Sequence, residues 1–158
     1  MIEVEITDEM IHEARKYAKE LGNLKNSIEK GAGNLAGFLG EILVRETFGY
    51  KSESTYDYDL VDPKGLKIDV KTKRTTVTPR PDYDCSVAAF NTKQKCDKYI
   101  FVRILSDLSK GWILGEMYKK EYFDSARYMT KGNVDPANGF TVKADCYNVA
   151  IQDLTECK

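Results

Sequence analysis

The sequence contains little histidine or cysteine, which narrows the chemistry that it can carry out. Its 158 residues include one histidine and four cysteines. The histidine, His12, lies in a stretch with helical spacing, so we expect it on the surface, and a mechanism that depends on histidine has little support. The cysteines show no Cys-x-x-Cys spacing, so they indicate neither a zinc ribbon nor a redox pair. We expect free thiols, as in a reducing cytoplasm.

The sequence also lacks long apolar runs and a strong excess of either charge. No run approaches the ~20 residues that a membrane-spanning helix needs, and residues 1–5 do not resemble a signal peptide. A formal net charge of −1 argues against a strongly basic nucleic-acid coat protein, but it is compatible with a local basic groove. Because there is no repeat or linker, we expect a single domain spanning residues 1–158. The expected free thiols favour a cytoplasmic location.

Two amphipathic helices are predicted near the N-terminus. The first begins at an N-cap, Thr7 or Asp8, and ends at Gly22-Asn23. A polar connection over residues 25–33 separates it from the second, which covers about residues 34–48 and has a broad apolar stripe.

The second helix contains two glycines and an acid at the border of its apolar stripe. Gly37 and Gly40 each cost the helix ~1 kcal/mol relative to alanine, which predicts that its backbone packs closely against another element. Glu41 follows at the edge of the stripe, where it is either a half-exposed surface residue or part of a site. Arg45, one turn later, is in position to pair with it.

The centre of the chain predicts a hairpin of two short strands joined by the turn Asp62–Gly65. Period-two alternation places Asp69 and Lys71 on one face of the second strand. With the turn centred on residues 63–65, Asp59 lies across the ladder from Asp69. Carboxylates this close repel one another unless a positive charge lies between them. A divalent metal ion is the simplest candidate, and a cross-strand surface salt bridge is the alternative.

Further elements follow the hairpin. Residues 72–84 are basic and contain prolines, so we expect an extended arm or loop. The clearest buried strand is 99–105, with 112–117 as its hairpin partner. A short strand at 85–91, a helix at 119–128 and a final edge strand at 147–151 complete the prediction. This order predicts an α/β (α+β) layered domain around a mixed sheet.

These segments resemble the PD-(D/E)xK nuclease superfamily, which includes many restriction endonucleases and phage or recombination exonucleases. Its pattern is a helical glutamate, an aspartate opening a hairpin, an acidic residue and a lysine two apart on the next strand, and a further strand. The corresponding segments here are Gly37-Phe-Leu-Gly-Glu41, Asp59-Leu-Val61, Ile68-Asp-Val-Lys-Thr72 and Tyr99-Ile-Phe-Val102. The resemblance covers about residues 34–105 and implies a restriction-endonuclease-like core, a mixed central sheet flanked by helices.

The resemblance also implies roles for individual residues. The catalytic set is Glu41, Asp59, Asp69 and Lys71. The three acids and the backbone carbonyl of Val70 are oxygen ligands suited to Mg²⁺ or Mn²⁺. Such ions polarise a phosphate and activate a bound water, and Lys71 would orient that water and stabilise developing negative charge.

One feature departs from the family pattern. Tyr58 precedes Asp59 where the family name places a proline. Asp57 therefore stays a rival for the first ligand, since both acids lie on the same face of their strand. Pro81-Asp82 comes after the lysine, in the wrong order.

Polar residues downstream of the hairpin form a basic flank. This flank is either a groove that follows phosphates or an ordinary solvated face, and Gln94 and Lys93 are candidates to approach the scissile phosphate. Three tyrosines, Tyr56, Tyr58 and Tyr83, either stack on bases or cover the sheet. The nucleic-acid-binding candidates are Lys73, Arg74, Arg80, Lys93, Gln94 and Lys95.

The sequence therefore predicts a Mg²⁺-dependent nuclease that hydrolyses phosphodiester bonds in DNA, of a phage, mobile-element, repair or small restriction-like type. Endo- and exo-action are both open, and a homodimer would suit double-strand cleavage. The alternatives are a catalytically inactive nucleic-acid-binding domain of the same fold, an RNA-directed nuclease, and a structural or interaction protein whose acids are merely solvated.

Overall fold

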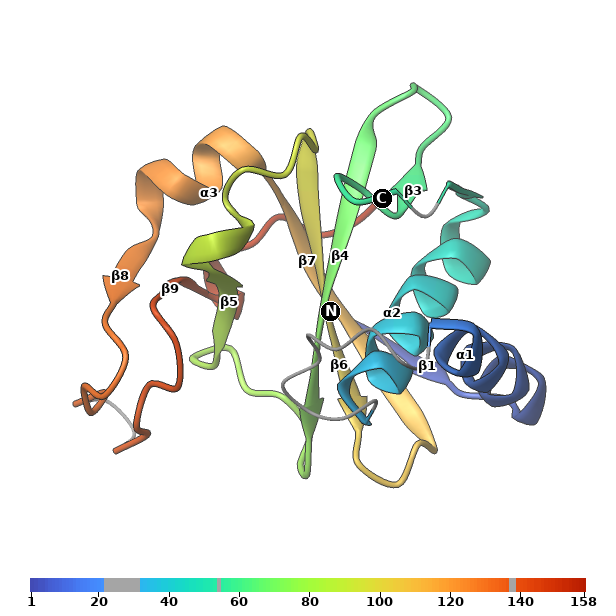
Figure 1. Cartoon of the computed structure of the whole chain (residues 1–158), viewed down its shortest axis with the longest axis horizontal. Helices are drawn as coiled ribbons and strands as arrows, with labels where there is room; N and C mark the ends of the chain where they lie inside the picture. The colour runs from blue at the N-terminus through green and yellow to red at the C-terminus, as the bar shows by residue number, and fades with distance from the viewer. Residues whose placement is uncertain (22–31, 54, 137–138) are drawn as a thin grey trace.

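The computed structural model describes residues 1–21, 32–53, 55–136 and 139–158, which form three layers (Figure 1). A six-stranded sheet is the middle layer. Helices α1 (Asp8–Leu21) and α2 (Ala32–Phe48) cover one face, whereas a three-stranded sheet and helix α3 (Lys119–Ser125) lie on the other. The predicted mixed α/β class is therefore confirmed.

The main sheet has the strand order β1-β7-β6-β4-β3-β2. Strands β4 and β6 run parallel, and the other neighbours are antiparallel. The strands predicted at 99–105 and 112–117 are confirmed as the antiparallel pair β6 and β7. The bounds are β1 (Ile2–Glu5), β2 (Lys51–Ser52), β3 (Leu60–Val61), β4 (Lys67–Thr75), β6 (Lys98–Leu105) and β7 (Lys110–Tyr118).

The small sheet has the order β5-β9-β8. It consists of β5 (Asp84–Ala88), β8 (Arg127–Met129) and β9 (Cys146–Ala150). The prediction that the last strand lies at an edge is wrong, because β5 and β8 pair with β9 on its two sides. The helix predicted at 119–128 is shorter than expected, since its last residues belong to β8.

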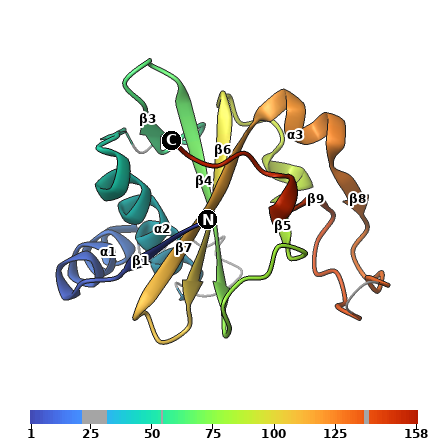
Figure 2. The same cartoon turned by 180° about the vertical axis from the view of Figure 1, so that it is seen from behind.

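The main sheet is buried on both faces and separates two apolar cores. On β6, Ile100, Val102 and Ile104 face the helices, whereas Tyr99 and Phe101 face the small sheet. This two-sided burial explains why the strand reads as a continuous apolar run. After β9, the C-terminal segment crosses back over β7 (Figure 2), where its backbone pairs with the strand in an isolated bridge.

Helix α1 begins as predicted, with Thr7 as its N-cap. The backbone N–H of Met10 donates to Thr7 Oγ1 at 3.2 Å, and His12 is exposed. The predicted end of this helix at Gly22-Asn23, and the connection over 25–33, lie outside the described residues.

Two further expectations concern the thiols and membrane-spanning helices. All four cysteines are free thiols. Among the helices in the described ranges, none is long and apolar enough to cross a membrane.

Close packing of α2 against the sheet depends on one of its two glycines. A Cβ built on Gly40 would overlap Thr72 Oγ1 of β4 and lie 3.0 Å from Thr72 Cβ. At Gly37, by contrast, an added Cβ meets no atom of the described chain within 4 Å. The prediction of close backbone packing therefore holds at Gly40 and is wrong at Gly37.

The two glycines provide a matched pair of substitutions. Gly40→Ala is expected to lower the free energy of unfolding by about 1–2 kcal/mol, because the cost of overpacking exceeds the gain in helix propensity. Gly37→Ala is expected to raise it by up to about 1 kcal/mol. Urea unfolding followed by circular dichroism measures both, and equal stabilities for the two variants would contradict the packing described here.

Candidate active site at the open edge of strand β4

The hairpin around the predicted acids has the expected register. Leu60 pairs with Ile68 and Val61 with Lys67, so the next residues outward, Asp59 and Asp69, lie opposite each other. The N–H of Asp59 donates to the carbonyl of Ile68 at 2.9 Å. The turn is also as predicted, with a backbone hydrogen bond of 2.9 Å that closes Asp62–Gly65.

Strand β3 is much shorter than β4, and this leaves an open edge. Beyond Asp69, no described strand pairs with the side of β4 that faces β3. The Asp59 carboxylate covers the first exposed group there, accepting the N–H of Val70 at 2.8 Å. Because the N–H and C=O of one strand residue point to the same side, the Val70 carbonyl also faces this edge.

Asp69 and Lys71 share a face of β4, as the alternation predicts. Lys71 Nζ lies 2.6 Å from Asp69 Oδ2, and both side chains are largely buried. The same ammonium donates to Gln94 Oε1 at 3.1 Å. Gln94 in turn donates to the carbonyl of Tyr56 at 2.8 Å, so a fixed amide holds the lysine head beside the acid.

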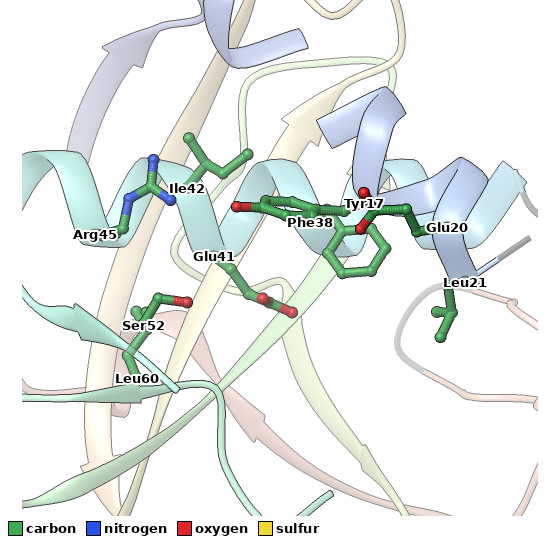
Figure 3. Close-up of a pocket in the computed structure, with 9 residues that line it drawn as sticks. All are labelled: Tyr17, Glu20, Leu21, Phe38, Glu41, Ile42, Arg45, Ser52 and Leu60. Atoms are coloured by element: carbon green, nitrogen blue, oxygen red, sulfur yellow. The ribbon is translucent and has the colours of Figure 1, made fainter. Parts of the chain in front are cut away.

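Glu41 reaches the site from α2, on the opposite face of the sheet. It lines a cavity of about 400 Å³ between the two N-terminal helices and the β2–β3 edge, and its carboxylate points away from the helix into that space (Figure 3). Burial, with repulsion from Asp59 and Asp69, raises the pKa of Glu41 to about 8. Glu41 is half-buried, and the effect of Asp59 and Asp69 on its pKa favours the alternative that it is part of a site.

The pKa of Asp59 is also raised. Burial and the charge of Asp69 raise the pKa of Asp59 to about 7, against the opposing effects of the Val70 N–H and Lys71. Glu41 and Asp59 are thus half-buried acids near the charge of Asp69, and a nearby cation would stabilise their ionised forms.

The predicted pairing of Glu41 with Arg45 is wrong. Arg45 instead forms a two-pronged pair with Glu13 of α1, at 2.8 and 2.7 Å, and also contacts Glu46. Glu41 therefore does not pair with the Arg45 guanidinium. Helical spacing alone could not reveal this, because the partner, Glu13, lies on another helix.

The structure separates the two rivals for the first acid. Asp57 Oδ1 accepts a hydrogen bond from the backbone N–H of Lys95 at 3.0 Å. Asp57 therefore stabilises the loop that contains Gln94. Asp59 is the acid that lies opposite Asp69 and raises the pKa of Glu41. Geometry therefore favours Asp59 over Asp57 as a member of the carboxylate group.

The donor set suits a hard divalent cation in kind, although its carboxylates are not gathered into a ready-made cage. Among the described residues, no group of three His, Cys, Asp or Glu side chains is close enough to hold a metal ion. The raised pKa values of Glu41 and Asp59 show which side chains would gain most from a cation. Carboxylate and carbonyl oxygens are the ligands that Mg²⁺ and Mn²⁺ prefer.

The basic flank is divided among several surfaces. Lys73 and Arg74 are both exposed; Lys73 lies on the same face of β4 as Lys71, and Arg74 alternates to the other face. Arg80 pairs with Asp82 at 3.1 Å, and Lys93 and Lys95 are exposed beside the buried Gln94. These residues therefore do not form one continuous groove.

The three tyrosines also differ in their surroundings. Tyr56 exposes 74% of its surface beside Gln94. Tyr58 donates to Glu53 at 2.6 Å, and Tyr83 packs against the core between the sheets. Tyr56 is thus the one of the three with a ring available to a stacked base.

Arg103 was missed by the sequence interpretation. It is 7% exposed on β6, and the parallel register places it beside Lys73 of β4. An arginine inside an otherwise apolar strand is the signal that indicates a buried charge there.

Comparisons with known proteins do not place the chain in a family. No protein-family model matches the sequence, and no curated protein matches it significantly.

Proposed function

We propose that this protein is a divalent-metal-dependent nuclease of PD-(D/E)xK type with a restriction-endonuclease-like core, which hydrolyses phosphodiester bonds in DNA. The observation that carries the proposal is that Asp59 and Asp69 lie opposite each other at the open edge of β4, with Lys71 beside Asp69, and that the charges of both aspartates raise the pKa of Glu41. Two of these acids have pKa values raised to about 8 and about 7. A surface salt bridge does not account for these raised values, because a cation beside a carboxylate lowers its pKa.

In this proposal the acids and the Val70 carbonyl hold Mg²⁺ or Mn²⁺. When bound, such an ion would polarise the scissile phosphate and lower the pKa of a bound water. Lys71 supplies a second positive charge, 2.6 Å from Asp69, where it can orient the water and stabilise charge that develops on the phosphate oxygens. Gln94 positions Lys71 and is not assigned a chemical step.

A second candidate, a nucleic-acid-binding domain without turnover, is favoured by one observation. The Lys71 ammonium already neutralises Asp69 and is held by Gln94. If this ion pair persists when substrate binds, Asp69 is not available to a cation, and the site binds phosphate without cleaving it.

A metal titration with three substrates separates these functions. The purified chain is incubated with end-labelled duplex DNA, single-stranded DNA and RNA in EDTA, Mg²⁺ or Mn²⁺. The proposal expects DNA cleavage that depends on the divalent ion and stops in EDTA. Binding without cleavage under every condition would support the second candidate, and cleavage of RNA alone would replace DNA as the substrate.

A further inference from the structure

A second cavity, of about 770 Å³, lies between the main sheet and the small sheet. Its walls come from β4 and β6 on one side and from β5, β9 and the segment before β9 on the other. Lys71 is among its lining residues, so the cavity adjoins the Asp69–Lys71 pair. Glu41 lines the smaller cavity on the opposite side of the sheet.

The floor of this second cavity carries two adjacent cations. Lys73 and Arg103 are register neighbours on β4 and β6. None of the ion pairs among the described residues includes either of them. The Arg103 guanidinium donates to the backbone carbonyl of Asp84 at 2.7 Å, although it is only 7% exposed.

The surroundings of the two cations disfavour their charged forms. Burial lowers the pKa of Lys73, and the charge of Arg103 lowers it further. Burial also lowers the pKa of Arg103. Two acids line the cavity, Asp84 and the buried Asp135. Asp84 is paired with Arg127 at 2.8 Å, and its charge partly opposes the lowering of both pKa values. Arg103 is buried and the neighbouring Lys73 is exposed. An anion in the cavity that contacts both would stabilise these two like charges, and phosphate is the anion that lysine and arginine commonly bind.

The size and lining of the cavity suit nucleotides. Its volume falls in the range of pockets that enclose small organic ligands. Lys73 Nζ lies 5.4 Å from the centre of the Phe140 ring, which is 48% exposed. A basic groove with an aromatic surface is the arrangement by which proteins hold unpaired nucleic-acid strands.

We propose that the cavity between the two sheets binds an unpaired strand of the substrate, with Lys73 and Arg103 on one phosphate and Phe140 against a base. This inference rests on the proposed nuclease function and narrows its substrate to single strands or to duplexes with unpaired ends. The strand would then enter the site past Lys71, which both regions share.

Binding without cleavage tests this assignment. The full chain, in EDTA, is titrated against a fluorescein-labelled oligothymidylate of about 10 nucleotides, a length within the range that single-strand sites cover, and against a blunt duplex. Lys73→Ala is expected to weaken binding of the single strand about fivefold to tenfold. It should also reduce the slope of log K against log salt by about 0.7, because one phosphate contact is lost.

Controls distinguish the cavity from general charge. Lys73→Arg should retain most of the affinity, and Lys120→Ala removes one exposed lysine of α3 and should leave the affinity and the salt slope unchanged. Melting temperatures verify that each variant is folded. Unchanged binding in Lys73→Ala, or a blunt duplex that binds as tightly as the single strand, would overturn the assignment.

Thymidine monophosphate serves as a competitor. If it binds as tightly as the oligonucleotide, the cavity is a mononucleotide site and the assignment to a strand is wrong. All these binding measurements are made in EDTA, so they do not depend on cleavage. Loss of strand binding would overturn this assignment alone, whereas absence of metal-dependent cleavage would overturn the proposed nuclease function alone.

Discussion

Replacing Asp69 with asparagine is expected to slow Mg²⁺-dependent DNA cleavage by about a hundredfold to a thousandfold, if the proposed function is right. The substitution keeps the shape of the side chain but removes a charged oxygen ligand and the partner of Lys71, which lies 2.6 Å away. Lys71→Met should have a similar effect through loss of the ammonium. Initial rates at saturating substrate measure both, and the loss should appear in kcat with little change in KM.

Two aspartates provide the comparison for this result. Asp59→Asn should lose about as much activity as Asp69→Asn, because the two acids lie opposite each other at the open edge. Asp57→Asn should lose much less, since an asparagine oxygen can still accept the Lys95 N–H. The exposed Asp124 of α3 serves as a neutralisation control. Full activity in Asp69→Asn would exclude the proposed site. A larger loss of activity in Asp57→Asn than in Asp59→Asn would favour Asp57 over Asp59 as the first metal ligand.

Glu41→Gln is expected to stabilise the metal-free protein at pH 8, by on the order of 2 kcal/mol. In the folded protein the pKa of Glu41 is about 8, against an ordinary value of 4.5. Between these pH values the folded state binds more protons than the unfolded state. The free energy of unfolding therefore falls as the pH rises from about 4.5 towards 8, and the neutral amide removes this loss.

Thermal denaturation in EDTA from pH 5 to pH 9 measures the effect. The melting temperature of the wild-type protein should fall over this range, and the curve of Glu41→Gln should be flatter, with a residual slope from Asp59. Glu46→Gln, on the exposed face of the same helix, should follow the wild-type slope. A wild-type melting temperature that rises steadily to pH 8 would contradict the raised pKa values. Added Mn²⁺ should stabilise the wild-type protein more at pH 8 than at pH 5, because ionised carboxylates bind it.

The parts of the fold that could be predicted from the sequence are those whose local pattern agrees with their burial. Strand β6 is apolar throughout because it lies between two cores, and the Asp62–Gly65 turn has a proline and a glycine at turn positions. The turn sets the register of the β3–β4 hairpin, and this register places Asp59 opposite Asp69. The mutual position of three of the four predicted site residues thus follows from strand alternation and a short turn.

Tertiary partners account for most of the errors. Helical spacing predicts that Arg45 pairs with Glu41, but Arg45 forms its ion pair with Glu13 of α1. Strand β1 has only four residues, too few for a clear alternating pattern. The small sheet joins β5, β8 and β9, which are far apart in sequence, so neither the central position of β9 nor the cavity beneath it could be predicted from local patterns.

The shortness of β3 has a consequence for the protein in solution. An open strand edge presents unpaired N–H and C=O groups that can recruit a strand from another molecule. Asp59 covers the Val70 N–H with a carboxylate, and an inward-pointing charge is one of the devices that prevent such pairing. The acid proposed to bind the metal would thus also disfavour edge-to-edge pairing of this strand with another molecule. An apolar residue at this position would therefore be expected to promote aggregation, which is a physical reason to test the site with asparagine rather than with leucine or valine.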